Sequence, residues 1–329
     1  MFEPPTVLDA QSLLDKAFRK ASKTSTTKGR NRIERQKNLA IAKVQAAGDV
    51  LVSTLESYEK GFPSLDRIPP FYRELIDVTV GVQILHTHLA AADWARGKVR
   101  ELTRQFARRI QATGGVGEVG EIRREAFGRL SSIIKQIAAN LDGLASARAP
   151  LKKLPDIDPE TPTIVVAGYP NVGKSLFVAA VSTAKPRIAA YPFTTQGVLV
   201  GHFDVGYRRF QILDTPGLLD RPMERRNRME RQAISALAHV ADAVLFLLDP
   251  SESCGYELSS QMRLLDTVRE TFPDVPILVV ENKADIVSTG LGRPAMSALT
   301  GKGVREVLDQ MVRLATSPAP GAAPPGTAG

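Results

Sequence analysis

Apolar residues in the first half of the chain recur at intervals of three and four, the spacing of one face of an α-helix. One series comprises Leu75, Val78, Val82, Leu85 and Leu89, and another comprises Phe127, Leu130, Ile133, Ile134, Ile137 and Leu141. Pro69 and Pro70 precede the first series, and the glycine-rich stretch 114–117 precedes the second. The pattern predicts a bundle of amphipathic helices.

The second half of the chain has short apolar runs that alternate with helical segments. The runs that we expect to form strands lie near 164–168, 198–203, 208–213, 243–249, 276–281 and 293–297. Strands that alternate with helices favour βαβ units. We therefore predict an α/β domain with a mainly parallel, doubly wound sheet and functional loops at the strand ends.

Composition places the boundaries between these parts. Residues 1–150 form the predicted helical domain, and 151–162 form a proline-bearing linker. The predicted α/β domain covers 163–315, and 316–329 form a Pro/Gly/Ala tail that we expect to be disordered. A chain of 329 residues with 43% hydrophobic content is long enough for two such domains.

Basic charge is concentrated in the first part of the chain. The net charge is +8, and residues 1–160 hold 26 Lys/Arg against 19 Asp/Glu, whereas the remainder holds 17 against 16. The run from Lys16 to Lys43 contains ten basic residues and a single acid, Glu34.

Such a run is often a solvated helix face or a flexible arm. It also suits a polyanion, through counterion release. Few aromatic residues interleave with it, so base stacking is not indicated. An apolar stripe with interfacial aromatics, which a membrane-surface helix needs, is also missing. We therefore favour structured RNA as the partner, with no membrane and no DNA expected.

A phosphate-binding loop follows the first apolar run of the second half. Gly168 to Ser175 read G-Y-P-N-V-G-K-S, which matches G-x-x-x-x-G-K-S between a strand and a helix. Backbone N–H groups and the helix N-terminus then face a polyphosphate, Lys174 pairs with the β- and γ-phosphates, and Ser175 holds Mg²⁺. The residues predicted to line this loop are Gly168, Tyr169, Pro170, Asn171, Val172, Gly173, Lys174, Ser175 and Leu176.

The base is predicted by N-K-x-D at the end of the run 276–281. Asp285 can accept hydrogen bonds from N1 and N2 of guanine, which adenine lacks, so GTP and GDP are favoured over ATP. Asn282 would fix the loop, and the stem of Lys283 would cover the base. Ser297, Ala298 and Leu299 resemble a last guanine loop, with the Ala298 N–H placed for the base O6.

Two further motifs complete the predicted pocket. Asp214 and Gly217 belong to D-x-x-G, whose carboxylate reaches Mg²⁺ through water and whose glycine N–H senses the γ-phosphate. Upstream, Thr194 and Thr195 both stand where a switch loop supplies a hydroxyl to Mg²⁺. The sequence does not choose between them. Lys174, Thr194, Thr195 and Gly217 are the predicted catalytic residues.

These loops resemble those of the translation-factor-related GTPases, which implies a Ras-like P-loop domain. G-Y-P-N-V-G-K-S, Y-P-F-T-T and D-T-P-G-L are similar to the Obg-related branch. Within that branch the chain resembles the Nog-type nucleolar GTP-binding proteins at Leu219-Asp220-Arg221-Pro222, Cys254-Gly255-Tyr256 and Gly201-His202. The long C-terminal extension of eukaryotic members is missing, which suggests a short, archaeal-like form.

The resemblance implies a GTP-hydrolysing switch in large ribosomal subunit assembly, with ribosomal RNA or a subunit precursor as its partner. Ras-like enzymes orient water with a glutamine at the position of Leu218, so a low intrinsic rate is expected. Asn171 resembles an asparagine that coordinates K⁺ in related GTPases, although it could simply stabilise the turn. The alternative function is an RNA-binding assembly or scaffold protein whose nucleotide is hardly turned over.

The sequence carries no pattern of a secreted or membrane protein. No apolar stretch approaches the length of a membrane span, and the N-terminus begins polar and proline-bearing. The single cysteine, Cys254, cannot form an internal disulfide. On these grounds the expected location is the cytoplasm.

Overall fold

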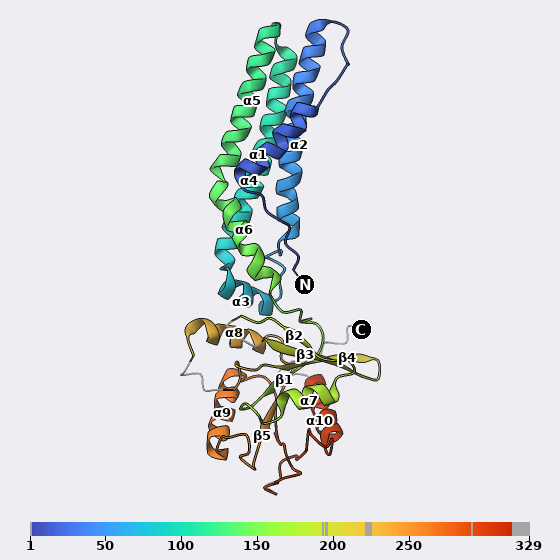
Figure 1. Cartoon of the computed structure of the whole chain (residues 1–329), viewed down its shortest axis with the longest axis vertical. Helices are drawn as coiled ribbons and strands as arrows, with labels where there is room; N and C mark the ends of the chain where they lie inside the picture. The colour runs from blue at the N-terminus through green and yellow to red at the C-terminus, as the bar shows by residue number, and fades with distance from the viewer. Residues whose placement is uncertain (1, 193, 195–196, 221–225, 291, 318–329) are drawn as a thin grey trace, which may run out of the picture. The chain divides into compact units, whose positions relative to one another are not determined.

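The computed structural model describes residues 2–192, 194, 197–220, 226–290 and 292–317 (Figure 1). These residues form two compact units. One unit holds Phe2–Ile68 and Val80–Lys152, and the other holds Pro69–Thr79 and the described residues from Lys153 onward. Thr195 and residues 318–329 of the predicted tail lie outside the described residues.

The first unit is helical, as its apolar spacing predicts. Its helices are α1 (Ala10–Lys23), α2 (Arg32–Gly61), α4 (Val82–Ala112), α5 (Val116–Gln136) and α6 (Ala138–Lys152). The first two begin at side-chain caps, because Asp9 accepts from the Ser12 N–H and Asn31 accepts from the Glu34 N–H. One part of the core comprises Ala40, Val44, Phe106, Ile110, Val119 and Ala126.

The long helices α2 and α4 approach each other closely at a glycine. A Cβ placed at Gly48 in α2 would collide with the Thr103 side chain of α4. The Thr103 hydroxyl is satisfied within its own helix, where it donates to the Val99 carbonyl at 2.7 Å. The absence of a side chain at Gly48 therefore permits this contact.

The second unit contains a sheet of strand order β2-β3-β4-β1-β5-β6. Its strands are β1 (Thr163–Ala167), β2 (Arg187–Ala189), β3 (Val198–Val205), β4 (Arg208–Asp214), β5 (Ala243–Leu248) and β6 (Ile277–Glu281). Strand β1 pairs in parallel with β4 and β5, and β5 with β6, whereas β3 runs antiparallel to β2 and β4.

Helices accompany this sheet as a doubly wound arrangement requires. They are α7 (Lys174–Val181), α8 (Arg228–Ala238), α9 (Leu258–Thr271) and α10 (Val304–Thr316). Helix α7 contacts α10, and α8 contacts α9, so one helix pair packs on either side of the sheet (Figure 1). The predicted fold class is thereby confirmed.

Two details of the predicted sheet are wrong. The run 293–297 forms only an isolated bridge, between Ala295 and Glu281. The edge strand β2 was not predicted, because it is short and largely exposed and exists through its pairing with β3. A strand defined by a distant partner leaves little local pattern to read.

Helix α3 (Pro70–Thr79) differs from the predicted division of the chain. Its apolar spacing placed it in the helical domain of residues 1–150, but its residues group with the α/β unit. The Tyr72 hydroxyl donates to the Ile157 carbonyl at 2.6 Å and accepts from the Ile157 N–H at 3.0 Å. Helical periodicity shows that a helix has an apolar face and does not show which core receives it.

The predicted linker is partly packed within the α/β unit. Leu154 and Ile157 are buried, and the Asp158 N–H donates to Gln211 of strand β4 at 3.1 Å. Proline content had marked this segment only as a linker. No single helix among the described residues passes a length-and-composition test for a membrane span, although α3 and α4 pass it jointly as a bent pair.

Candidate functional site

The predicted phosphate loop leaves the buried strand β1 and enters helix α7 at Lys174. Three residues in it have left-handed backbone conformations, namely Gly168 (φ 136°), Asn171 (φ 62°) and Gly173 (φ 101°). A Cβ at Gly168 would collide with the Leu247 carbonyl, and one at Gly173 would collide with the Asn282 amide. The glycines of the motif are therefore required by both conformation and space.

Lys174 is folded back into this loop. Its side chain is buried, and Nζ donates to the Gly168 and Tyr169 carbonyls at 2.8 Å each. Burial lowers the pKa of Lys174, while the carboxylates of Asp214 and Asp220 act in the opposite direction. The ammonium is thus held where a bound polyphosphate would gain most from a cation.

Two of the residues predicted to hold Mg²⁺, Ser175 and Asp214, lie side by side. The Ser175 hydroxyl donates to Asp214 Oδ2 at 2.5 Å. Asp214 Oδ1 is buried and has no hydrogen-bond partner among the described residues. Burial also raises the pKa of Asp214, and the hydrogen bond from Ser175 and the charge of Lys174 offset this effect only in part. A hydroxyl and an under-coordinated carboxylate are hard oxygen donors, so these residues fit Mg²⁺.

Asn282 joins the phosphate loop to the guanine loops. Its Nδ2 donates to the Val172 carbonyl at 2.7 Å, and its Oδ1 accepts from the Ala298 N–H at 2.9 Å. This differs from the prediction that the Ala298 N–H points to the base O6, because the Asn282 side chain takes that donor. Ser297 is buried, whereas Leu299 is exposed.

Asp285 is placed differently from Asn282. It is exposed and forms no hydrogen bond or ion pair with the described residues. A carboxylate in this state keeps both oxygens available for a ligand. The Leu176 and Asn171 side chains are exposed as well, and the Val172 side chain is fully buried in the sheet core.

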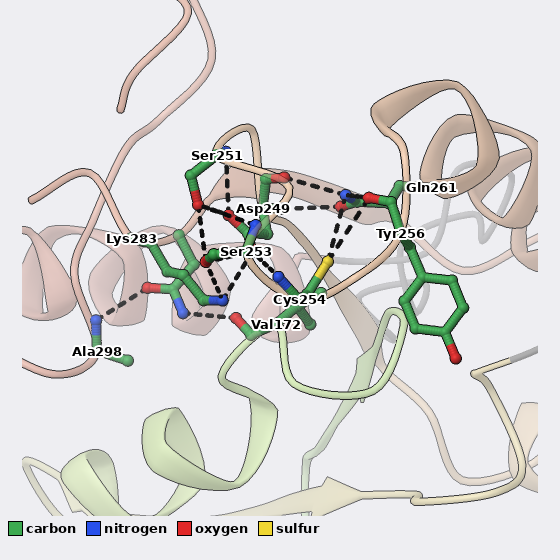
Figure 2. A network of polar contacts seen from close by, with 10 residues as sticks. Val172, Asp249, Ser251, Ser253, Cys254, Tyr256, Gln261, Lys283 and Ala298 are labelled. Carbon is green, nitrogen blue, oxygen red and sulfur yellow. Dashed lines mark hydrogen bonds and ion pairs between the residues drawn. The ribbon is translucent and has the colours of Figure 1, made fainter. Parts of the chain in front are cut away.

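Sequence reasoning missed Asp249, which follows β5 and organises the predicted base-binding lysine (Figure 2). Asp249 is fully buried, and its Oδ2 accepts from Lys283 Nζ at 2.7 Å and from the Cys254 N–H at 2.8 Å. Its Oδ1 accepts from the Ser251 hydroxyl at 2.5 Å. The only sequence signal was an acid at a strand end, followed by two serines.

The charge state of Asp249 follows from these contacts. Burial favours its neutral form, but hydrogen bonds from Lys283 and Ser251 outweigh that cost and lower the pKa of the carboxyl. Lys283 has a left-handed backbone with φ 60°. The ion pair with Asp249 therefore holds Lys283, whose backbone is strained, in one position.

Gln261 of helix α9 fixes the loop that carries this network. Its Oε1 accepts from the Asp249 N–H at 2.8 Å, and its Nε2 donates to the Asp249 and Tyr256 carbonyls at 3.0 and 2.9 Å. The Tyr256 ring in turn stacks on Tyr169 of the phosphate loop, with centroids 4.2 Å apart. The loop after β5 thus supports the phosphate loop as well as Lys283.

We expect Asp249→Asn to weaken binding of GDP and of a GTP analogue equally, by about 10-fold, because a charge-assisted hydrogen bond to Lys283 is lost. Titration of each nucleotide with a fluorescent derivative measures this. Glu270→Gln changes an exposed acid on α9 and serves as the control. A loss confined to the triphosphate would contradict the assignment of Asp249 to the base side of the pocket.

The two predicted switch segments are tied by local contacts. The Thr194 hydroxyl donates to the Tyr191 carbonyl at 2.9 Å and accepts from the Gly197 N–H at 3.1 Å. The hydroxyl is therefore engaged within its own turn. Leu218 is buried, and the Gly217 N–H donates to Asp220 at 2.8 Å.

Comparison with known proteins agrees with this geometry. Residues 3–158 match the family model described as NOG1 N-terminal helical domain, and residues 228–285 match the model for Nucleolar GTP-binding protein 1. The chain belongs to the nucleolar GTP-binding protein 1 family. The resemblance drawn from its loops is confirmed.

Relatives within the family align over most of this chain. Nucleolar GTP-binding protein 1 of Saccharomyces cerevisiae is 36% identical over 285 residues, which is 86% of this chain and 44% of the yeast protein. An uncharacterised protein of Methanocaldococcus jannaschii is 37% identical over 86% of this chain and 80% of its own length. The chain thus spans less than half of the yeast relative and most of the archaeal one.

A solved structure of a Plasmodium falciparum protein described as nucleolar GTP-binding protein 1 is 35% identical and covers 49% of this chain and 90% of its own. Its TM-score is 0.43, so the structural superposition adds no argument of its own.

The predicted cytoplasmic location is wrong by this comparison. Relatives from several fungi carry the name nucleolar GTP-binding protein 1, which points to the nucleolus in eukaryotic members of the family. The prediction used only the composition of the chain and its apolar stretches, and neither criterion separates the nucleus from the cytoplasm.

Proposed function

We propose that this chain binds GTP and GDP, hydrolyses GTP slowly, and uses the change of nucleotide to control binding to ribosomal RNA or a large-subunit precursor. The observation that carries the proposal is the position of Asn282, which links the Val172 carbonyl to the Ala298 N–H. That link brings three separate loops together as one nucleotide pocket. Membership of a GTP-binding family supports the same function.

Each loop of the pocket would bind a different part of the nucleotide. Lys174 and the N–H groups at the start of α7 would bind the β- and γ-phosphates, since buried donors stabilise developing charge most effectively. Asp285 would bind the guanine edge, while Lys283, held by Asp249, would cover the base. The Gly217 N–H would meet the γ-phosphate.

Ser175 and Asp214 would hold Mg²⁺, with Thr194 or Thr195 as a further ligand. The ion would neutralise phosphate charge during transfer. Thr194 would have to leave the hydrogen bonds to Tyr191 and Gly197 before it could serve.

The hydrolysis step would lack a side chain that orients water after Gly217. Leu218 is 1% exposed and packs inward, so it offers neither a hydrogen bond nor a surface to the nucleophile. A low intrinsic rate follows unless an ion or partner supplies the missing group. K⁺ beside Asn171 is one such source, although the left-handed Asn171 also fits a purely local turn role.

The basic run of α1 would supply the RNA-binding surface. Lys16, Arg19, Lys20 and Lys23 are exposed and line one surface hollow of that helix. None of them forms an ion pair with the described residues. Unpaired, closely spaced cations favour phosphate binding without base reading.

The experiment that tests the whole proposal measures GTP turnover in K⁺ buffer with and without purified large ribosomal subunits or their precursors. Sedimentation with the same particles is measured in GTP and in GDP. Nucleotide-dependent co-sedimentation with faster turnover supports the switch. Binding that is indifferent to nucleotide, without acceleration, supports the scaffold alternative instead.

We expect replacement of Lys16, Arg19, Lys20 and Lys23 by glutamine to weaken binding to ribosomal RNA by about 10²-fold at low salt. The salt dependence should also become shallower, because fewer phosphate contacts mean that fewer counterions are released on binding. Filter binding over a salt series gives both quantities. The control replaces Lys60 and Lys98, which are already paired with Glu56 and Glu101. Equal affinity in the two sets would identify the α1 run as an ordinary solvated face.

A further inference from the structure

The N–H of Gly217, the group expected to sense a γ-phosphate, already has an anionic partner within its own loop. It donates to Asp220 Oδ2 at 2.8 Å. Gly217 itself is exposed and has a left-handed backbone with φ 78°. A carboxylate oxygen and a phosphate oxygen are equivalent acceptors for one N–H, so the two compete for it.

Arg226 holds this carboxylate in place. Its side chain is 1% exposed, and its guanidinium lies 3.5 Å from Asp220 Oδ1. The same guanidinium donates to the Gly217 carbonyl at 2.8 Å. Arg226 therefore contacts both Gly217 and the carboxylate that accepts from the Gly217 N–H. Breaking a buried charge-assisted contact of this kind costs free energy.

The loop is also connected to both sides of the predicted phosphate site. The Gly168 N–H donates to the Leu219 carbonyl at 3.2 Å, next to Asp220. On the other side, Arg226 immediately precedes Asn227, the cap of helix α8. Asp220 is thus held by Arg226, which precedes α8, and follows a residue that contacts the phosphate loop.

We propose that Asp220 is an internal substitute for the γ-phosphate, held by Arg226, and that it sets the preference of this pocket for GDP over GTP. This inference rests on the proposed function. GDP leaves the Gly217–Asp220 contact intact, whereas GTP must displace the carboxylate and separate it from Arg226. The free-energy cost of that exchange weakens the binding of GTP and does not affect the binding of GDP.

The test compares affinities for GDP and for GTPγS by fluorescence titration. The wild-type protein is expected to bind GDP about 10-fold more tightly than GTPγS, the ratio that one charge-assisted hydrogen bond supports. Asp220→Asn is expected to raise the GTPγS affinity by about 10-fold and to leave GDP binding unchanged. Asp266→Asn, at an exposed pair on α9, is the matched control.

The double variant Asp220→Asn with Arg226→Gln removes both charges of this pair together. It is expected to show the same rise in GTPγS affinity, and thermal unfolding verifies that each variant is folded. An unchanged ratio in folded variants would overturn the inference, as would a wild-type protein that prefers GTPγS. A wild-type protein that binds neither nucleotide would instead overturn the proposed function.

Discussion

Replacement of Asp285 by asparagine is expected to weaken GDP binding by about 100-fold or more and to allow xanthine nucleotides to bind in its place. The carboxylate is exposed and has no hydrogen-bond partner among the described residues, so it is free to accept from guanine N1 and N2. An asparagine amide would instead face the N2 amine of guanine with a donor. Xanthine carries an oxygen there and matches the amide.

Competition titration with GDP and XDP measures this change in specificity. Asp274→Asn, which alters another exposed acid of the same unit, is the control and should leave both affinities alone. If the Asp285 variant kept its preference for GDP, that result would contradict the proposal that this loop binds the guanine base. Loss of binding to both nucleotides, with the protein folded, would mean that Asp285 supports the loop.

The second large effect is expected at Lys174, whose replacement by alanine should weaken binding of GDP and GTPγS by roughly 10²–10⁴-fold. The buried ammonium would make two charge-assisted contacts to phosphate, each worth about 1.5–3 kcal/mol. Its removal also leaves the Gly168 and Tyr169 carbonyls without the donors that they now have.

Isothermal titration of the variant with each nucleotide gives the affinities, and circular dichroism reports whether the fold is kept. Lys185→Ala removes an exposed lysine of the same unit and should change nothing. Near-normal GDP binding by a folded Lys174 variant would contradict the phosphate-loop assignment.

The sequence predicted the elements whose information is local. The helical spacing of the first half correctly indicated helices, although the first series is divided between α3 and α4 and the second between α5 and α6. The buried runs produced β1, β3, β4, β5 and β6. The phosphate loop could be read from its order of strand, glycines and helix. Each of these features depends on residues within about two turns or one strand of each other.

Features that depend on distant partners were not predictable. Strand β2 exists through its pairing with β3, and helix α3 is assigned by Tyr72 meeting Ile157, 85 residues further on. The Ala298 N–H was expected to serve the base and instead donates to Asn282, because the position of that side chain depends on how the loop after β6 approaches the segment that holds Ala298.

The chemistry of the nucleotide pocket divides in the same way. Residue order alone predicted the roles of Lys174, Ser175 and Asp285, because each follows from functional groups at set distances along its own loop. Folding decided the positions of Asp249 against Lys283 and of Asp220 against Gly217. Those contacts require burial and hydrogen-bond geometry created when separate segments pack together. Motif spacing therefore predicted the nucleotide-binding groups, and tertiary packing decided which charged side chains contact them.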